Sequence, residues 1–170
     1  MAKQKDSKHQ LQGKQAKAEG KRFEQRLDAA FAYYREKGFA LIEKTPEPMR
    51  VIKRLDNGKF LCVFEKRAQP DYKGVIKGGR TVVFEAKYTI KDRLQQNQVT
   101  PGQAAYLEQQ SKLGARCWVL AGFSSGEVYC IPWAVWATMK ELFGRKYVKE
   151  TELEKYRVPL AWNGVLLILS

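Results

Sequence analysis

Two carboxylates and a lysine stand close together in the sequence around a glycine-rich turn. Asp71 precedes the turn at Gly78–Gly79, and Glu85 and Lys87 follow it at the end of an apolar run. Side chains alternate across a strand, so Glu85 and Lys87 are expected on one face. A hairpin at Gly78–Gly79 brings Asp71 back beside Glu85. Two neighbouring carboxylates repel each other unless they share a cation, so the pattern predicts a cation site.

These side chains suit the hydrolysis of a phosphodiester. A hard divalent ion such as Mg²⁺, with Mn²⁺ as a substitute, prefers oxygen ligands. Lys87 can hold an attacking water or neutralise charge on the reacting phosphate. Glu24 can add a carboxylate to a second ion, and Gln103 can orient the water or contact a phosphate. A Glu-x-Lys triplet also occurs on solvated strand faces, and Glu24 and Gln103 also fit ordinary polar positions on helices.

The charge of the chain favours a polyanionic partner. The 31 Lys and Arg residues exceed the 18 Asp and Glu residues, which gives a formal net charge of +13. Such an excess repels itself unless it meets a polyanion, so nucleic acid is the expected partner. No apolar run approaches the roughly 18–20 residues that cross a bilayer, and the basic N-terminal segment lacks the apolar face of a membrane-surface helix. We therefore expect no membrane contact.

The N-terminus and the cysteines favour the cytoplasm. The N-terminal segment is charged and lacks an apolar signal region, so no secretion is expected. Cys62, Cys117 and Cys130 are scattered and lie in apolar runs without C-x-x-C spacing. This pattern predicts buried free thiols in a reducing compartment, and neither a zinc site nor a disulfide framework.

The order of expected elements predicts a mixed α/β domain with a central sheet. Residues 1–18 are expected as a basic disordered arm and residues 19–170 as a single domain. The basic residues in and just after the arm, Lys14, Lys17, Lys21 and Arg22, are expected to lie along phosphates. Helices are expected at 19–37, 101–112, 133–143 and near 150–155; strands at 42–68 around an Asp56-Asn57-Gly58 turn, before and after Gly78–Gly79, and at 117–123, 128–131 and 165–169. Residues 91–100 are expected as a loop, and the four tryptophans as core packing rather than base stacking.

The segment Pro70-Asp71…Glu85-x-Lys87 resembles the PD-(D/E)xK nuclease motif. More narrowly, residues 71–75, the turn at Lys77-Gly78 and the segment 84–87 are similar to the RecU family of Holliday junction resolvases. The helix with Phe23-Glu24, the Thr45-Pro46-x-Pro48 segment, the helix around Gln103, the strand pair 117–131 and the tail at 145–148 continue the likeness. It extends from about Glu19 to the C-terminus, although the chain is short for the family.

The resemblance implies a restriction-endonuclease-like fold: a mixed β-sheet flanked by helices, with a projecting β-hairpin stalk at about 49–68. It implies that Asp71 and Glu85 bind the metal with help from the Ala86 carbonyl, and that Lys87 is the catalytic lysine. Glu24 matches an acidic residue and Gln103 a glutamine near the active site. It further implies a homodimer whose stalk enters a four-way DNA junction. The DNA contacts expected on the stalk and beside the site are Lys53, Arg54, Lys59, Lys66, Arg67 and Lys73.

The expected function is a structure-selective, Mg²⁺-dependent endonuclease that resolves Holliday junctions in recombination. Two alternatives stay open at this point. One is a PD-(D/E)xK nuclease with another DNA target. The other is a DNA-binding protein without catalysis, for which the basic arm and basic hairpin would suffice.

Overall fold

The structure of the chain is a computed structural model, which describes the backbone of residues 2–65 and 69–170 and the side chains from residue 13 onward within those ranges. Its helices are α1 (Ala2–Glu36), α2 (Pro101–Lys112), α3 (Trp133–Ala137) and α4 (Met139–Phe143), with 3₁₀ turns at Gln96–Gln98, Glu150–Glu152 and Glu154–Tyr156. Its strands are β1 (Ala40–Lys44), β2 (Met49–Arg54), β3 (Phe60–Phe64), β4 (Tyr72–Ile76), β5 (Arg80–Thr89), β6 (Arg93–Gln95), β7 (Arg116–Phe123), β8 (Val128–Pro132) and β9 (Tyr147–Lys149).

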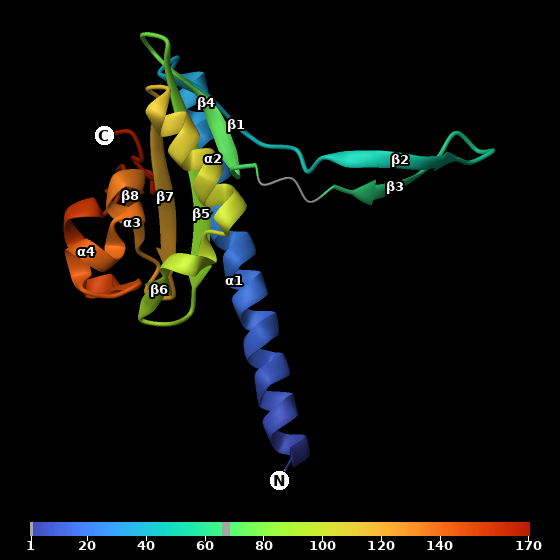
Figure 1. Cartoon of the computed structure of the whole chain (residues 1–170), viewed down its shortest axis with the longest axis horizontal. Coiled ribbons are helices and arrows are strands. Elements are labelled where there is room, and N and C mark those ends of the chain that lie inside the picture. The colour runs from blue at the N-terminus through green and yellow to red at the C-terminus, as the bar shows by residue number, and fades with distance from the viewer. Residues whose placement is uncertain (1, 66–68) are drawn as a thin grey trace.

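A five-stranded mixed sheet forms the centre of the body, in the order β1-β4-β5-β7-β8. The β5–β7 pair is parallel and the other three pairs are antiparallel. A parallel pair needs a long crossover, which is supplied here by the segment that contains α2. The prediction of a central mixed sheet flanked by helices, with a projecting hairpin, is confirmed (Figure 1).

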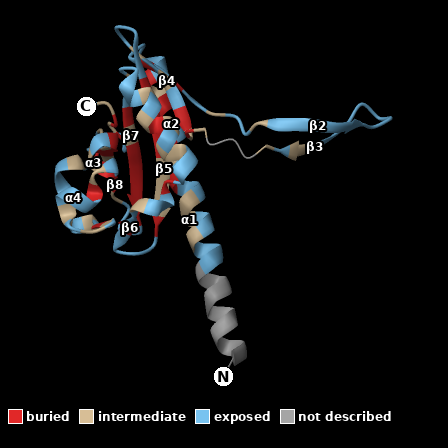
Figure 2. Cartoon of the chain, viewed as in Figure 1, coloured by how far each residue is buried: buried red, intermediate tan, exposed pale blue. Residues whose placement is uncertain are grey.

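Helices cover both faces of this sheet, and each face has its own core. On one face, Phe23, Leu27 and Phe31 of α1 pack against Tyr72 and Phe84 of the sheet. On the other face, the apolar side chains of α2, α3 and α4 pack against β5 and β7; among them are Leu107, Trp133, Trp136, Met139, Val83 and Val119. Figure 2 shows the buried residues concentrated along β5 and β7. We call these two sides the α1 face and the α2 face.

Helix α1 is longer than the sequence pattern predicted. Its helical backbone begins at Ala2, whereas the prediction placed a disordered arm over residues 1–18 and the helix start at Glu19. No proline interrupts this segment, and its many Lys, Gln and Ala residues have good helix propensity. The end of the helix was predicted correctly, because Gly38 takes the left-handed conformation, with φ of 68°, that often follows a helix. Beyond the body the helix extends away from the sheet (Figure 1).

Several other expectations differ from the structure. The helix expected at 133–143 is divided into α3 and α4 at Thr138, whose hydroxyl donates to the Ala134 carbonyl oxygen. The strand expected at 165–169 forms only one isolated bridge, from Leu166 to Leu160, because its apolar side chains pack into the α1-face core instead of joining a ladder. Residues 91–100, expected as a loop, contain β6 and a 3₁₀ turn.

Two side chains expected in the interior are exposed. Trp162 is 98% exposed, and the Cys62 thiol lies on the surface of the projecting hairpin. Both occur in short apolar runs, from which burial cannot be decided without the surrounding structure. In the described part of the chain, none of the helices is long and apolar enough to span a bilayer.

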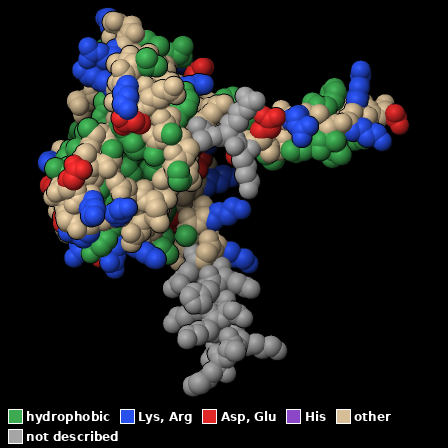
Figure 3. Space-filling view, in the orientation of Figure 1, with side chains coloured by type: hydrophobic (Ala, Val, Ile, Leu, Met, Phe, Trp, Pro, Cys, Tyr) green, Lys and Arg blue, Asp and Glu red, His purple; other side chains and the backbone are tan. Residues whose placement is uncertain are grey.

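The β2–β3 hairpin projects away from the body (Figure 1). Its strands pair antiparallel around Gly58, where φ is 74°, as the Asp-Asn-Gly signal predicted. The cross-strand pairs Met49–Phe64, Val51–Cys62 and Arg54–Phe60 define one side of the hairpin, which we call the apolar hairpin face after its members Met49, Val51, Phe60, Cys62 and Phe64. All five are exposed, and Figure 3 shows hydrophobic side chains along this hairpin beside Lys and Arg.

Candidate nuclease site

Strand register places Asp71 beside Glu85. Tyr72 of β4 pairs with Phe84 of β5 in an antiparallel ladder, so the residue before Tyr72 lies opposite the residue after Phe84. A carboxylate oxygen of Asp71 accepts a 2.8 Å hydrogen bond from the backbone N–H of Ala86. The prediction that the hairpin returns Asp71 to Glu85 is therefore confirmed.

The carboxylate of Glu85 is completely buried on the α2 face, with 0% of the residue exposed. Its Oε1 atom accepts hydrogen bonds from Lys87 Nζ at 2.6 Å and from Gln103 Nε2 at 2.5 Å. Its Oε2 atom is buried and has no hydrogen-bond partner. A buried carboxylate oxygen without a partner is costly, so this atom is the part of the site that most needs a cation.

Burial and, next in size, the negative charge of Asp71 together raise the pKa of Glu85 from its ordinary value of 4.5 to about 7. The nearby Lys87 ammonium opposes both effects by stabilising the ionised form. A positive ion placed between the two carboxylates would also favour ionisation, because it offsets both the burial and the repulsion. Lys87 alone does not offset the burial of Glu85 and its repulsion by Asp71, because the pKa of Glu85 is still raised.

The residues present fit a divalent cation. Glu85 Oε2 is free to bind, Asp71 lies next to it, and the Ala86 carbonyl belongs to the same strand segment. Within the described ranges, no group of three or more His, Cys, Asp and Glu side chains could hold a metal ion. A site with two carboxylates suits Mg²⁺, which is commonly bound by one or two carboxylates and completes its shell with water and substrate phosphate.

Helix α2 delivers Gln103 to the site. The helix runs from Pro101 to Lys112, as predicted, and Gln103 lies in its first turn, where the amide reaches Glu85. Gln103 was expected near the site from its place in the sequence, whereas its partner Thr100 was not. Thr100 is the N-cap of α2 and forms a capping box with Gln103. The T-x-x-Q spacing ahead of the helix is the signal that identifies such a box.

Glu24 is bound by a lysine in the structure. It lies on α1 and forms a 2.5 Å ion pair with Lys44 at the end of β1. Lys44 pairs with Tyr72 in the register of β1 and β4, and Tyr72 belongs to the α1-face core, whereas Glu85 is on the α2 face. The hydrogen bond from Lys44 to Glu24 and the negative charges of Glu24 and Asp71 all raise the pKa of Lys44, so Glu24 and Asp71 act on the same lysine. The expected roles of Glu24 as a metal ligand and catalytic group stay predictions.

Around Glu24 on the α1 face lies a second group of polar side chains, which includes Asp28, Lys44 and Tyr72 and was not expected from the sequence. The Tyr72 hydroxyl donates to Asp28 at 2.8 Å, and burial raises the pKa of Tyr72. The hydrogen bond to Glu24 raises the pKa of Lys44. The backbone N–H of Thr45, next to Lys44, donates to the Asp71 carbonyl oxygen at 2.8 Å. The Thr45 hydrogen bond thus links the backbone of Asp71 to the end of β1, next to Lys44.

The basic residues expected to contact DNA lie on three surfaces. The exposed side chains Lys14, Lys17, Lys21 and Arg22 are on α1, Lys53, Arg54 and Lys59 are on the hairpin, and Lys73 is on β4. Lys66 and Arg67 lie outside the described residues. Lys73 is two residues after Asp71 on the same strand face, so it stands beside the site.

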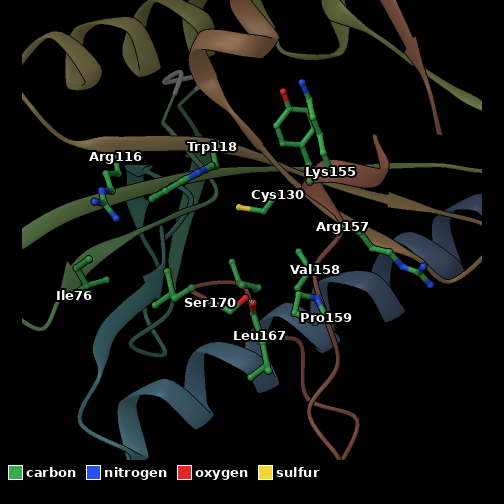
Figure 4. Close-up of a pocket in the computed structure, with 13 residues that line it drawn as sticks. Ile76, Arg116, Trp118, Cys130, Lys155, Arg157, Val158, Pro159, Leu167 and Ser170 are labelled. Atoms are coloured by element: carbon green, nitrogen blue, oxygen red, sulfur yellow. Dashed lines mark hydrogen bonds between the residues drawn. The ribbon is translucent and has the colours of Figure 1, made fainter. Parts of the chain in front are cut away.

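A cavity of about 230 Å³ lies apart from this site, between β7, β8 and the C-terminal segment (Figure 4). Trp118 and Cys130 line its interior, while the charged ends of Lys155 and Arg157 point away from it (Figure 4). Arg157 is bound by Glu127 at 2.6 Å and by Glu154 at 3.3 Å. The residues that line the cavity include no Asp or Glu side chain, so it lacks the paired carboxylates of the Asp71–Glu85 site.

A mixed sheet that presents Asp71, Glu85 and Lys87 together is the arrangement of the PD-(D/E)xK class of proteins. The family of Recombination protein U, RecU, matches residues 18–168 of the chain. The chain belongs to the RecU family.

Two RecU relatives agree with this assignment. The Holliday junction resolvase RecU of Geobacillus kaustophilus (strain HTA426) is 30% identical over 157 residues, which are 85% of this chain and 78% of the relative. The Holliday junction resolvase RecU of Streptococcus pneumoniae (strain Hungary19A-6) is 32% identical over 120 residues, 66% of this chain and 60% of the relative. Among solved structures, Archaeoglobus fulgidus Hjc, a Holliday junction resolvase, aligns with a TM-score of 0.49 and 14% identity, over 79% of this chain and 92% of that chain.

Proposed function

We propose that the chain is a divalent-metal-dependent endonuclease that resolves Holliday junctions. Membership of the RecU family and the names of the RecU relatives support the substrate. The observation that carries the chemistry is the free, buried Oε2 atom of Glu85 beside Asp71. Phosphodiester hydrolysis needs positive charge at such a place, because the phosphate gains negative charge as water adds.

Asp71, Glu85 and the Ala86 carbonyl would hold the ion, for which we infer Mg²⁺ with Mn²⁺ as a substitute. When bound, the ion supplies positive charge that stabilises the additional negative charge on the phosphate. Lys87 donates to Glu85 Oε1, and its side chain keeps 19% of its surface exposed, so its ammonium can turn to a phosphate oxygen. Gln103 donates to the same Glu85 oxygen and fixes the carboxylate.

DNA contact would come mainly from the basic side chains of α1 and the hairpin. Both elements extend beyond the body (Figure 1). Exposed Lys and Arg side chains occur on the described parts of both elements (Figure 3). Such contacts go to phosphates, so binding is expected to weaken steeply with salt and to depend on the shape of the DNA rather than its base sequence. A branched DNA with several duplex arms offers phosphates to both elements at once.

A second copy of the chain is the partner that we infer for the apolar hairpin face. This face is exposed to water. Within the described ranges, β2 and β3 pair only with each other and join no other strand. A two-stranded hairpin is only marginally stable alone, so contact with an identical hairpin would stabilise it. The resulting dimer has two sites related by a two-fold axis, which matches the approximate symmetry of a four-way junction.

Cleavage of a synthetic four-way junction and of a linear duplex with the same arm sequence tests the proposal, each with Mg²⁺ and with EDTA. We expect paired cuts in the junction that require Mg²⁺. The Asp71→Asn variant should bind the junction and not cut it, whereas Glu141→Gln, which changes an exposed carboxylate on α4, should cut normally. Equal cutting of the linear duplex would indicate an unselective nuclease. Absence of cutting over a range of Mg²⁺ and Mn²⁺ would leave only DNA binding and refute the proposal.

A further inference from the structure

The first turn of α2 fixes the orientation of the Gln103 amide. The backbone N–H of Thr100 donates to Gln103 Oε1 at 3.0 Å, and the Thr100 hydroxyl donates to the same oxygen at 3.0 Å. The backbone N–H of Gln103 points back to the Thr100 hydroxyl oxygen at 3.4 Å. The amide oxygen of Gln103 is therefore engaged by two donors from a single residue, the N-cap of the helix.

This arrangement decides which end of the amide faces Glu85. A glutamine amide has one acceptor oxygen and one donor NH₂ group. Because Thr100 holds the oxygen, the NH₂ group is left for Glu85, and it donates to Oε1 at 2.5 Å. Lys87 donates to that same oxygen at 2.6 Å. Both donors thus engage Oε1, and Oε2 is left without a protein partner.

We propose that Thr100 is a positioning residue for the cation site: by holding the Gln103 amide oxygen, it determines which oxygen of Glu85 is available to the divalent cation. This inference rests on the proposed function, because it assumes that Glu85 binds a cation. Thr100 contacts neither the cation nor the DNA in this scheme and acts through Gln103. With Thr100, the site includes the N-cap of α2, which lies outside the PD-(D/E)xK motif.

The Thr100 hydroxyl matters for this role because it donates as well as accepts. If the amide of Gln103 were reversed, its oxygen would face Glu85 Oε1, and two acceptors would repel each other. Glu85 would then turn, and the oxygen reserved for the cation would move. Changes to residues that orient a metal ligand typically lower metal affinity by about 10- to 100-fold.

Substitution by aspartate separates the two roles of Thr100. In Thr100→Asp, the carboxylate still accepts from the Gln103 backbone N–H, so the helix cap is retained. The backbone N–H of residue 100 still donates to the Gln103 amide oxygen, but the carboxylate replaces the hydroxyl donor with an acceptor that repels this oxygen. In Thr100→Ser, both roles are retained. The measurement is calorimetric titration of the full chain with Mn²⁺ in the absence of DNA, together with the thermal unfolding temperature. Thr81→Asp, the same substitution at an exposed position of β5, is the matched control for added charge.

We expect Thr100→Asp to bind Mn²⁺ about tenfold or more weakly than the wild type while remaining folded. Thr100→Ser should match the wild type, and Thr81→Asp should bind Mn²⁺ within about twofold of it. In a Gln103→Met background, Thr100→Asp should have no additional effect, because the residue through which it acts is gone.

Two results would overturn the inference. One is a Mn²⁺ affinity of Thr100→Asp equal to that of the wild type. The other is an equally large loss of Mn²⁺ affinity when Thr100→Asp is introduced into Gln103→Met. The titration does not depend on DNA cleavage, so the two proposals can fail separately. A chain that binds Mn²⁺ but cuts no junction would remove the proposed nuclease function and leave the role of Thr100 intact. A wild-type chain that binds no Mn²⁺ would remove both.

Discussion

Ionisation of Glu85 should destabilise the metal-free protein as the pH rises. The folded protein keeps the Glu85 proton up to a pKa of about 7, whereas an unfolded chain loses it near 4.5. Between these values the unfolded state binds fewer protons, so the free energy of unfolding falls with increasing pH. Since one pKa unit corresponds to about 1.4 kcal/mol, the complete fall amounts to roughly 3 kcal/mol.

Urea denaturation in EDTA measures this effect, with the unfolding free energy determined at several values between pH 4.5 and 8. The Glu85→Gln variant is the reference, because it keeps the shape of the side chain and cannot ionise. We expect the wild type to lose roughly 3 kcal/mol relative to Glu85→Gln across this range. Mg²⁺ at pH 8 should restore stability to the wild type and not to the variant, because a ligand that binds only the folded state stabilises it.

Parallel pH curves for the two proteins would refute the reasoning. They would mean that Glu85 has the same pKa in the folded and unfolded states, and so that its burial and the charge of Asp71 do not act as the structure indicates. A wild type that gains stability with rising pH relative to Glu85→Gln would be a stronger contradiction. It would require a carboxylate that is already well stabilised without a metal ion.

Three further predictions concern catalysis, assembly and DNA contact. Lys87→Met should slow single-turnover junction cleavage by about 100-fold or more with junction affinity unchanged, as expected for a lost transition-state donor; an unchanged rate would remove Lys87 from catalysis. Phe64→Glu should dissociate the dimer in sedimentation experiments, because it places a charge on the apolar hairpin face, and a dimer that persists would locate the interface elsewhere. Replacing Lys53 and Lys59 together with glutamine should reduce the slope of log affinity against log salt by about 2; an unchanged slope would show that the hairpin does not contact phosphates.

The local signals in the sequence were sufficient for much of the fold. Pro101 and Gly114 bounded α2, Gly38 ended α1, and the two glycine turns defined the hairpins, because each residue restricts the backbone in its own neighbourhood. Apolar runs were less informative. The segment 165–169 reads as a strand in the sequence, yet it packs against α1 with a single bridge. Burial of such a run depends on what lies opposite it, and that is set by distant parts of the chain.

The sequence determined the central part of the candidate site for a geometric reason. Asp71 and Glu85 are joined by a short hairpin, and strand alternation fixes the common face of Glu85 and Lys87. Only the tertiary structure decided the other contacts. Glu24 pairs with Lys44 at the end of β1, and Gln103 reaches Glu85 because α2 packs on that face, with Thr100 holding the oxygen of its amide. The local backbone sets the relative positions of side chains that are joined by one turn. The relative positions of side chains on different elements depend on how those elements pack.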